Sequence, residues 1–316
     1  MNIEADFLGI GYEKITLRQP DDYDGEVFTT IVRKRCAEPA LKSVLYIHGF
    51  QDYFFQAELA EKFNANGFDF YALDLRKCGR SHRPHQLLHF NKSFDEYNED
   101  IDSAIRLITE QDGHQRVLLA AHSTGGISAA LYADAGAYKD RISAVFFNSP
   151  FFGLNEPKLN YWSLRIFGGI LSLILPKLIV QKMASIYALS MHKAHHGQWD
   201  FNTAWKPTEP FPIRVAWISS VLNSQKIIQR GLSIECPILL MHSARSKRFK
   251  TWSDDLLKVD SVLNIEHMKK YGATLGRDVT RIEIQDGVHD LVLSDQSVRG
   301  KVYAALFDWL EKRFPE

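Results

Sequence analysis

The sequence predicts an α/β fold, in which helices cover both faces of a mostly parallel sheet and a helical cap is inserted into the core. Short apolar runs alternate with helical segments along most of the chain, which is typical of a parallel sheet. The alternation stops near residue 151 and resumes near residue 231, and a turn of small residues at Ser123 joins an apolar run directly to a helix. We therefore expect a core of residues 1–150 and 231–316 and an inserted cap of residues 151–230.

The chain opens with two segments of mixed β-branched and polar residues, 12–18 and 26–35, separated by three aspartates and a glycine. This pattern predicts two antiparallel strands joined by a turn. The elements after them alternate in type, because four-to-eight-residue apolar runs predict strands and longer periodic segments predict helices. We expect strands at 43–48, 68–75, 116–121 and 142–148, and helices at 53–66, 93–111 and 124–137.

After the cap the alternation returns with a strand at 236–242, a helix at 262–271, a strand at 279–285 and a final helix. The final helix carries one apolar face, formed by Val298, Val302, Leu306, Trp309 and Leu310.

The cap contains the most apolar run of the chain, 166–175. Pro176 and Lys177 end this run well short of the about 20 residues that a transmembrane helix needs, so we expect no transmembrane segment. Two interpretations stay open: the run favours a hydrophobic acyl group in the substrate, or it forms the cap's own core.

Composition excludes several classes of partner. Lys and Arg total 38, as do Asp and Glu, so the net charge is zero and no global field favours nucleic acid. The three cysteines lack the spacing of a disulfide framework or a zinc site. The first residues lack the basic start and apolar run of a signal peptide, and we expect a cytoplasmic protein. The sequence does not fix the oligomeric state.

The strongest chemical signal is the stretch from Ala121 to Gly125, Ala-His-Ser-Thr-Gly. In a nucleophile elbow, small residues two positions before and after the serine let the strand and helix backbones approach across a strained turn. Alanine here replaces the usual first glycine and adds only a small Cβ. The alternative is an ordinary serine cap at a helix start, so the other elements of a site must decide.

Two backbone N–H groups are expected to form an oxyanion hole for acyl transfer. The elbow supplies one from Thr124, and Phe50, which follows His48 and Gly49 after the strand at 43–48, is the candidate for the other. For His48 we favour a structural role, bracing the loop by hydrogen bonds.

His289 has the placement of a general base. It follows the last expected strand and a turn at Asp286 and Gly287, where a histidine can reach over the edge of the sheet to the serine. His192, His195 and His196 have helical spacing that suits a metal. The carboxylate pattern of a third ligand is absent, so a solvated cap face is the better interpretation and no metal is expected.

At this point the chain resembles the α/β-hydrolases of the monoacylglycerol lipase, lysophospholipase and serine aminopeptidase group. His48 and Gly49 resemble the family's HG motif, and 74–81 (Asp-Leu-Arg-Lys-Cys-Gly-Arg-Ser) resembles its D-x-R-G-x-G-x-S loop. Ser123 and His289 follow in the right order. The chain departs from the family pattern at Lys77, which replaces a glycine, and at Ala121.

The resemblance also suggests the acid of the triad. The family places it shortly after the strand that ends here at His242, but 243–247 contains no carboxylate. Asp260, followed by Ser-Val-Leu and a helix, resembles the family's D-x-V-V segment, so we assign Asp260 and infer an insertion at 244–259. Asp254 and Asp255 are the rivals, although carboxylates are common at the start of a helix.

The resemblance thus implies a serine hydrolase that cleaves carboxylic esters, including lipid-like esters such as lysophospholipid or monoacylglycerol, without a cofactor. A peptidase or an acyltransferase would use the same triad. A binding protein of this fold without turnover is the other class of alternative.

Overall fold

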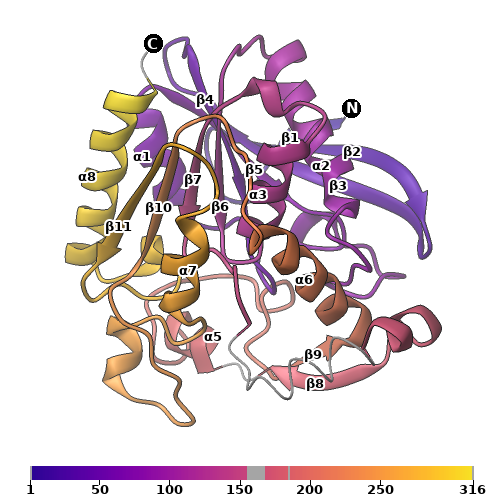
Figure 1. Ribbon diagram of the computed structural model, residues 1–316. Helices are drawn as coiled ribbons and strands as arrows, with labels where there is room; N and C mark the ends of the chain where they lie inside the picture. The colour runs from indigo at the N-terminus through magenta and orange to yellow at the C-terminus, as the bar shows by residue number, and fades with distance from the viewer. Residues whose placement is uncertain (1, 155–167, 184–185, 315–316) are drawn as a thin grey trace.

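The computed structural model describes residues 2–154, 168–183 and 186–314. A nine-stranded sheet crosses the molecule with the strand order β1-β2-β3-β5-β4-β6-β7-β10-β11. From β5 onward in this order, neighbouring strands are parallel, whereas β1, β2, β3 and β5 pair antiparallel. The predicted fold class is confirmed (Figure 1).

The strands of the sheet are β1 (Asn2–Ala5), β2 (Tyr12–Asp22), β3 (Gly25–Lys34), β4 (Lys42–Ile47), β5 (Phe68–Asp74), β6 (Val117–His122), β7 (Ile142–Asn148), β10 (Ile238–Ser243) and β11 (Val279–Ile284). The helices that cover the sheet are α1 (Ala57–Ala65), α2 (Glu96–Arg106), α3 (Gly125–Ala135), α6 (Val215–Ile228), α7 (Ile265–Gly272) and α8 (Gln296–Arg313).

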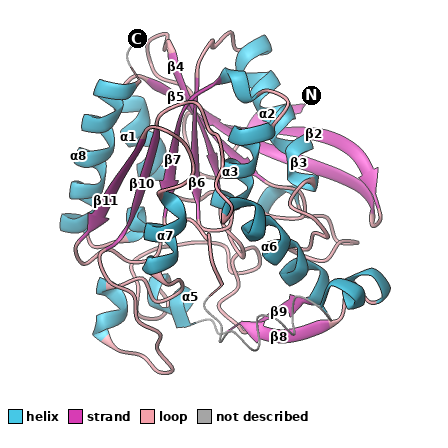
Figure 2. Cartoon of the chain, viewed as in Figure 1, coloured by secondary structure: helices cyan, strands magenta, loops and turns pink. Residues whose placement is uncertain are grey.

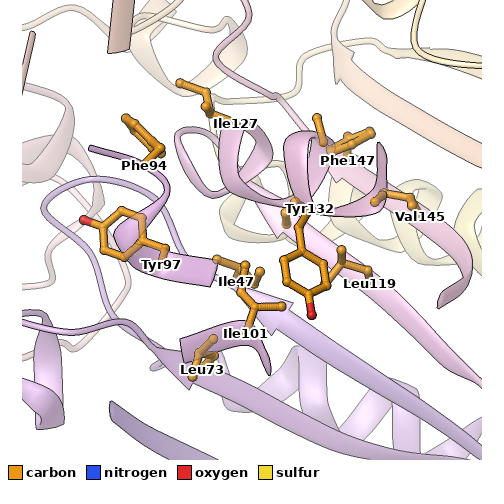
Figure 3. Packing of buried hydrophobic residues seen from close by; sticks show 14 of the residues in the cluster. Ile47, Leu73, Phe94, Tyr97, Ile101, Leu119, Ile127, Tyr132, Val145 and Phe147 are labelled. Carbon is orange, nitrogen blue, oxygen red and sulfur yellow. The ribbon is translucent and has the colours of Figure 1, made fainter. Parts of the chain in front are cut away.

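Alternate side chains of each central strand enter two separate hydrophobic clusters, as the two-residue period of a strand requires. In β4, Leu45 packs in the cluster with α2, α3, α6 and α7, whereas Val44 packs in the cluster with α1 and α8. Figure 2 shows these two helical layers on opposite faces of the sheet. In Figure 3, Ile101 of α2 and Tyr132 of α3 point toward strand residues such as Leu119.

The segment after β7 contains the described elements β8 (Ile179–Met183), α5 (Ile186–Met191) and β9 (Phe211–Arg214), followed by α6. β8 and β9 form a separate two-stranded antiparallel ribbon. Helix α6 differs from β8, α5 and β9. It packs against α3, and its buried residues belong to the same hydrophobic cluster as those of α3. The expected cap boundary of 151–230 stays a prediction.

Part of the apolar run of the cap is exposed, which neither interpretation offered by the sequence anticipated. Residues 166 and 167 lie outside the described residues, and 168–174 is helical. Leu173, Ile174 and Leu175 are exposed, so these side chains neither form a core for the cap nor line a cavity. None of the described helices combines the length and the apolar character needed to cross a bilayer.

Candidate active site

Ser123 occupies a sharp turn between β6 and α3. Its φ is 52°, in the left-handed region that a non-glycine residue adopts at a cost, and its N–H donates to the carbonyl oxygen of Asn148 at 3.1 Å. A Cβ on Gly125 would lie 2.5 Å from the carbonyl oxygen of His48. The turn therefore needs glycine at position 125, whereas Ala121 fits within β6.

The structure brings Ser123, His289 and Asp260 into one hydrogen-bonded row. The Oγ of Ser123 lies 3.0 Å from Nε2 of His289, and Nδ1 of His289 lies 2.9 Å from Oδ2 of Asp260. All three side chains are buried. Because a carboxylate only accepts, Nδ1 carries the proton and donates it to Asp260, which leaves Nε2 free to accept from the serine hydroxyl.

Asp260 is held by its own loop. Its Oδ1 accepts from the N–H groups of Val262 and Leu263 at 2.9 and 2.8 Å, and its backbone pairs with Arg245 and Lys247. The chain thus leaves the sheet after Ser243, and the loop returns Asp260 beside residues 245–247. This path explains how Asp260 reaches His289 although residues 243–247 contain no carboxylate.

The rival carboxylates lie elsewhere. Asp254 and Asp255 begin a 3₁₀ turn (Asp254–Lys258). Asp255 forms an ion pair with Lys247 at 3.2 Å, with both side chains more than half exposed. Of the three candidates, Asp260 is the one that hydrogen-bonds to His289.

Phe50 and Thr124 face the same small cavity beside Ser123. Within the described part of the chain, neither of their N–H groups donates to an acceptor, so both are free for a ligand oxygen. His48 braces this loop: its Nε2 accepts from the N–H of Leu75 at 3.2 Å, and its Nδ1–H therefore donates to the carbonyl oxygen of Gly49 at 2.7 Å.

Sequence reasoning missed Asn148 and Asp290, which join the serine loop to the histidine loop. The carbonyl oxygen of Asn148 accepts from Ser123, and its side-chain amide donates to Oδ1 of Asp290 at 2.7 Å. Asp290 also accepts from Gln56 at 3.1 Å. Asn148 ends β7 and Asp290 follows His289, so adjacency to motif residues was the available signal.

The described part of the segment after β7 also reaches the site. The phenol oxygen of Tyr187 in α5 accepts from the N–H of Asp290 at 2.9 Å, and its ring contacts that of His289 edge-on. On the other side, the ammonium of Lys206 lies 2.8 Å from Oδ1 of Asp52, and both side chains are buried. This segment therefore touches both the histidine loop and the oxyanion loop.

The cavity beside Phe50 and Thr124 has a volume of about 10 Å³, close to the space that one water molecule needs. The Phe50 and Trp217 rings, whose centroids lie 4.0 Å apart, form part of its wall. Its wall also contains Cys78 and His89. Burial lowers the pKa of His89 to about 3 and raises that of the Cys78 thiol far above its ordinary value, so both are uncharged at neutral pH.

The described residues contain one cluster with the donor types of a metal site, formed by Asp52, His122 and Asp290. Lys206 already pairs with Asp52, amides donate to both oxygens of Asp290, and Nδ1 of His122 donates to the carbonyl oxygen of Asn148. A buried ammonium beside the ligands disfavours a cation. Of the three histidines considered above, His195 and His196 are exposed and His196 stacks on Trp252, whereas His192 is buried, so the solvated-face interpretation is wrong for His192.

The family model described as serine aminopeptidase, S33 (Hydrolase_4), matches residues 38–257, well over half of the chain. The chain belongs to this family. The resemblance predicted from the motifs is confirmed. The match includes Ser123 and ends before Asp260 and His289. No curated protein sequence matches the chain.

Solved structures show the same fold at low sequence identity. A soluble variant of monoglyceride lipase from Saccharomyces cerevisiae, in complex with a substrate analogue, is 16% identical with a TM-score of 0.70 over 94% of both chains. A carboxyl esterase from Bacillus coagulans is 13% identical, with a TM-score of 0.66 over 96% of this chain and 99% of the other. Mouse alpha/beta hydrolase domain-containing protein 10 is 13% identical, with a TM-score of 0.60 over 95% and 98%.

The departure at Lys77 from the pattern expected of the serine aminopeptidase family has a structural account. Lys77 keeps the left-handed conformation that suits glycine, with φ at 62°. Its side chain is fully buried, and its ammonium lies 2.7 Å from Asp22 and 2.8 Å from Asp24. The lysine thus fastens the loop after β5 to the turn between β2 and β3.

Proposed function

We propose that the chain is a serine hydrolase that cleaves carboxylic esters through an acyl-enzyme. The observation that carries the proposal is the hydrogen-bonded row from Ser123 through His289 to Asp260. Such a row activates a hydroxyl that is otherwise a weak nucleophile.

In the proposed acylation step, Oγ of Ser123 attacks the ester carbonyl carbon while Nε2 of His289 takes the hydroxyl proton. The carbonyl oxygen becomes an oxyanion, which the N–H groups of Phe50 and Thr124 stabilise. Nε2 then gives its proton to the leaving alcohol as the C–O bond breaks. Asp260 holds His289 in the required tautomer and stabilises the imidazolium.

Deacylation repeats these roles with water. Nε2 of His289 takes a proton from the attacking water, a second oxyanion forms, and the proton returns to Oγ of Ser123 as the acid leaves. No metal or cofactor enters either step.

The cavity wall favours esters over peptides with a free amino terminus. An aminopeptidase must hold a substrate ammonium, which calls for a carboxylate near the scissile bond. Among the described residues, those that line the cavity include no Asp or Glu, and buried Asp52 is already paired with Lys206. We therefore place ester hydrolysis ahead of aminopeptidase activity, and acyl transfer remains the second use of the same triad.

We further propose lipid-like acyl esters, such as monoacylglycerol or lysophospholipid, as the substrate class. A long acyl chain does not fit a cavity of about 10 Å³, whose wall includes the Phe50 and Trp217 rings. Acceptance of such a chain through this cavity requires these two rings to move.

The test of the proposed function is covalent labelling with a fluorophosphonate, which needs an activated serine. We expect the wild type to be labelled and Ser123→Ala to be unlabelled. Ser128→Ala, which changes a second buried serine near the cavity, serves as the matched control and should keep the label. A wild type that folds and takes no label would support a binding protein without turnover.

Substrate class is tested with p-nitrophenyl esters of graded acyl length, with monoacylglycerol, lysophospholipid and leucine p-nitroanilide alongside. We expect hydrolysis of the esters and little cleavage of the anilide. Faster cleavage of the anilide than of every ester would contradict the proposal. The cytoplasmic location stays a prediction that these assays do not address.

A further inference from the structure

An apolar surface covers the outer side of the segment after β7. Of the thirteen large apolar side chains exposed in the described residues, seven lie between residues 170 and 180. They are Ile170, Leu173, Ile174, Leu175, Leu178, Ile179 and Val180. We call these seven residues the apolar rim.

Exposure along the rim is high. The exposed fractions of Ile170, Leu173 and Ile174 are 61%, 85% and 70%. Strand β8 is exposed on both of its faces through most of its length, although a half-buried strand normally hides alternate residues. Soluble monomers rarely expose contiguous apolar surface on this scale without an interaction partner.

The charged residues within the stretch that contains the rim are both positive. The stretch 168–183 contains Lys177 and Lys182 and no carboxylate. Lys177 is paired with Asp24 at 2.7 Å. Lys182 is exposed and makes no ion pair with the described residues, and Arg214 lies across the ribbon from Ile179. A cation beside exposed Leu, Ile and Val side chains is the combination that binds an anionic lipid surface.

The rim lies on the same side of the molecule as the candidate active site. Ser123 follows the carboxyl end of β6, and Figure 1 shows β8 and β9 beyond the carboxyl ends of the parallel strands. A surface held by the rim would therefore face the end of the molecule at which Ser123 lies.

We propose that the apolar rim docks the protein on an anionic lipid surface, with Leu173 and Ile174 entering the acyl region and Lys182 contacting lipid phosphates. Docking goes beyond the proposed function and does not require catalysis. It would supply lipid esters from the surface to which the protein is bound.

The test is sedimentation with vesicles of phosphatidylcholine alone or mixed with phosphatidylglycerol, using Ser123→Ala protein so that no lipid is hydrolysed. We expect binding to the mixed vesicles, and at least about tenfold weaker binding for Leu173→Ser/Ile174→Ser because apolar area is lost. Lys182→Glu should weaken binding to the mixed vesicles by about tenfold and leave binding to neutral vesicles unchanged.

The matched control is Ile10→Ser/Leu41→Ser. It removes two exposed apolar side chains that lie outside the rim, and it should bind as the parent protein does. Each variant is also made with Ser123 intact, and its hydrolysis of p-nitrophenyl acetate reports whether it folds. If the wild type does not hydrolyse this ester, the proposed function is contradicted and the docking proposal is not.

Two results would overturn the docking proposal. One is absence of binding by the folded parent protein, or an equal loss in the control variant. The other is a parent dimer in sedimentation velocity that Leu173→Ser/Ile174→Ser converts to a monomer, because a second copy would then cover the rim.

Discussion

At the scale of a residue, Asp260 could be identified from the sequence although it lies unusually far along the chain from the end of β10. Its backbone pairs with Arg245 and Lys247, so residues 248–259 form an excursion that leaves the loop after β10 in place. The sequence predicted Asp260 because the segment after it kept the family pattern. Asn148 and Asp290 were missed although they adjoin motif residues, because no motif marks the hydrogen bond between their side chains.

We expect Asp260→Asn to lower kcat by about 10⁴, since an amide cannot hold the imidazole in the tautomer that accepts from serine. Asp254→Asn and Asp255→Asn should stay within about twofold, because both side chains are exposed and the ion pair of Asp255 with Lys247 lies at the surface. The measurement is kcat for p-nitrophenyl acetate, with circular dichroism as the check on folding. Near-normal turnover in Asp260→Asn would remove Asp260 from the triad.

Trp217 forms part of the cavity wall, and the centroid of its ring lies 4.0 Å from that of Phe50. Trp217→Ala should raise the ratio of kcat/KM for octanoyl over acetyl esters by about tenfold, as an enlarged apolar pocket gains contact with added methylenes. The ratio does not depend on the fraction of active protein, so a loss of stability in the variant does not obscure it. Trp217→Phe is the control and should shift the ratio less. An unchanged ratio in both variants would place the acyl chain elsewhere.

At the scale of elements, local pattern predicted most strands and helices, and the differences have physical causes. β1 was not predicted, because its four residues, Asn-Ile-Glu-Ala, are too few to show a period and depend on pairing with β2. The helix expected at 53–66 begins at Ala57. Residues 53 and 54 instead serve the loop, where the N–H of Phe54 donates to Asp74.

The chain segment 199–206 and the oxyanion loop act together through the buried pair of Lys206 and Asp52. Removing one partner of a buried pair leaves an uncompensated charge and costs about 3 kcal/mol. We expect Lys206→Met to lower both kcat and the free energy of unfolding, because Asp52 lies two residues from Phe50.

The second substitution makes this prediction specific. Lys206→Met/Asp52→Asn should recover most of the stability and part of kcat, since no charge is then left unpaired. Lys193→Met breaks an ion pair with Asp200 in which both side chains are more than half exposed, and it should change neither quantity. Equal losses in the single and double variants would mean that the pair does not position the loop.

Deletion of residues 155–230 would disturb the core as well as the segment after β7. That deletion also takes away α6, whose Val221 and Leu222 are buried in the cluster shared with α3. A deletion that ends before Val215 keeps this layer of the core, so it is the better truncation for separating substrate selection from folding.

At the scale of the whole molecule, the alternation of strands and helices was sufficient to predict the architecture, because it is a property of the chain as a whole. Buried histidines are not visible in such a pattern. Burial lowers the pKa of His89, His122 and His242, and together they make the stability of the fold depend on pH.

The sign of this dependence follows from proton uptake. Above about pH 6.5 these histidines are neutral in both the folded and the unfolded chain. Below it the unfolded chain binds more protons at these histidines than the folded chain does, so the free energy of unfolding falls as the pH falls, by at most about 1.4 kcal/mol per unit for each histidine. Asp100 opposes this trend, because burial raises its pKa to about 6 and the folded chain then binds a proton that the unfolded chain releases between about pH 6 and 4.

With three histidines against one carboxyl, we expect a lower free energy of urea unfolding at pH 5.5 than at pH 7.5. His89 is the clearest contributor, since its pKa falls from 6.5 to about 3 while its ring remains between Cys78 and the carbonyl of Trp205. His89→Gln cannot titrate, so its loss of stability over that interval should be smaller than that of the wild type by about 1.4 kcal/mol. His85→Gln is the matched control, because His85 is exposed, and it should lose as much stability as the wild type. If His89→Gln and the wild type lose the same amount, then His89 takes up a proton in the folded chain and the wall of the cavity is charged in acid.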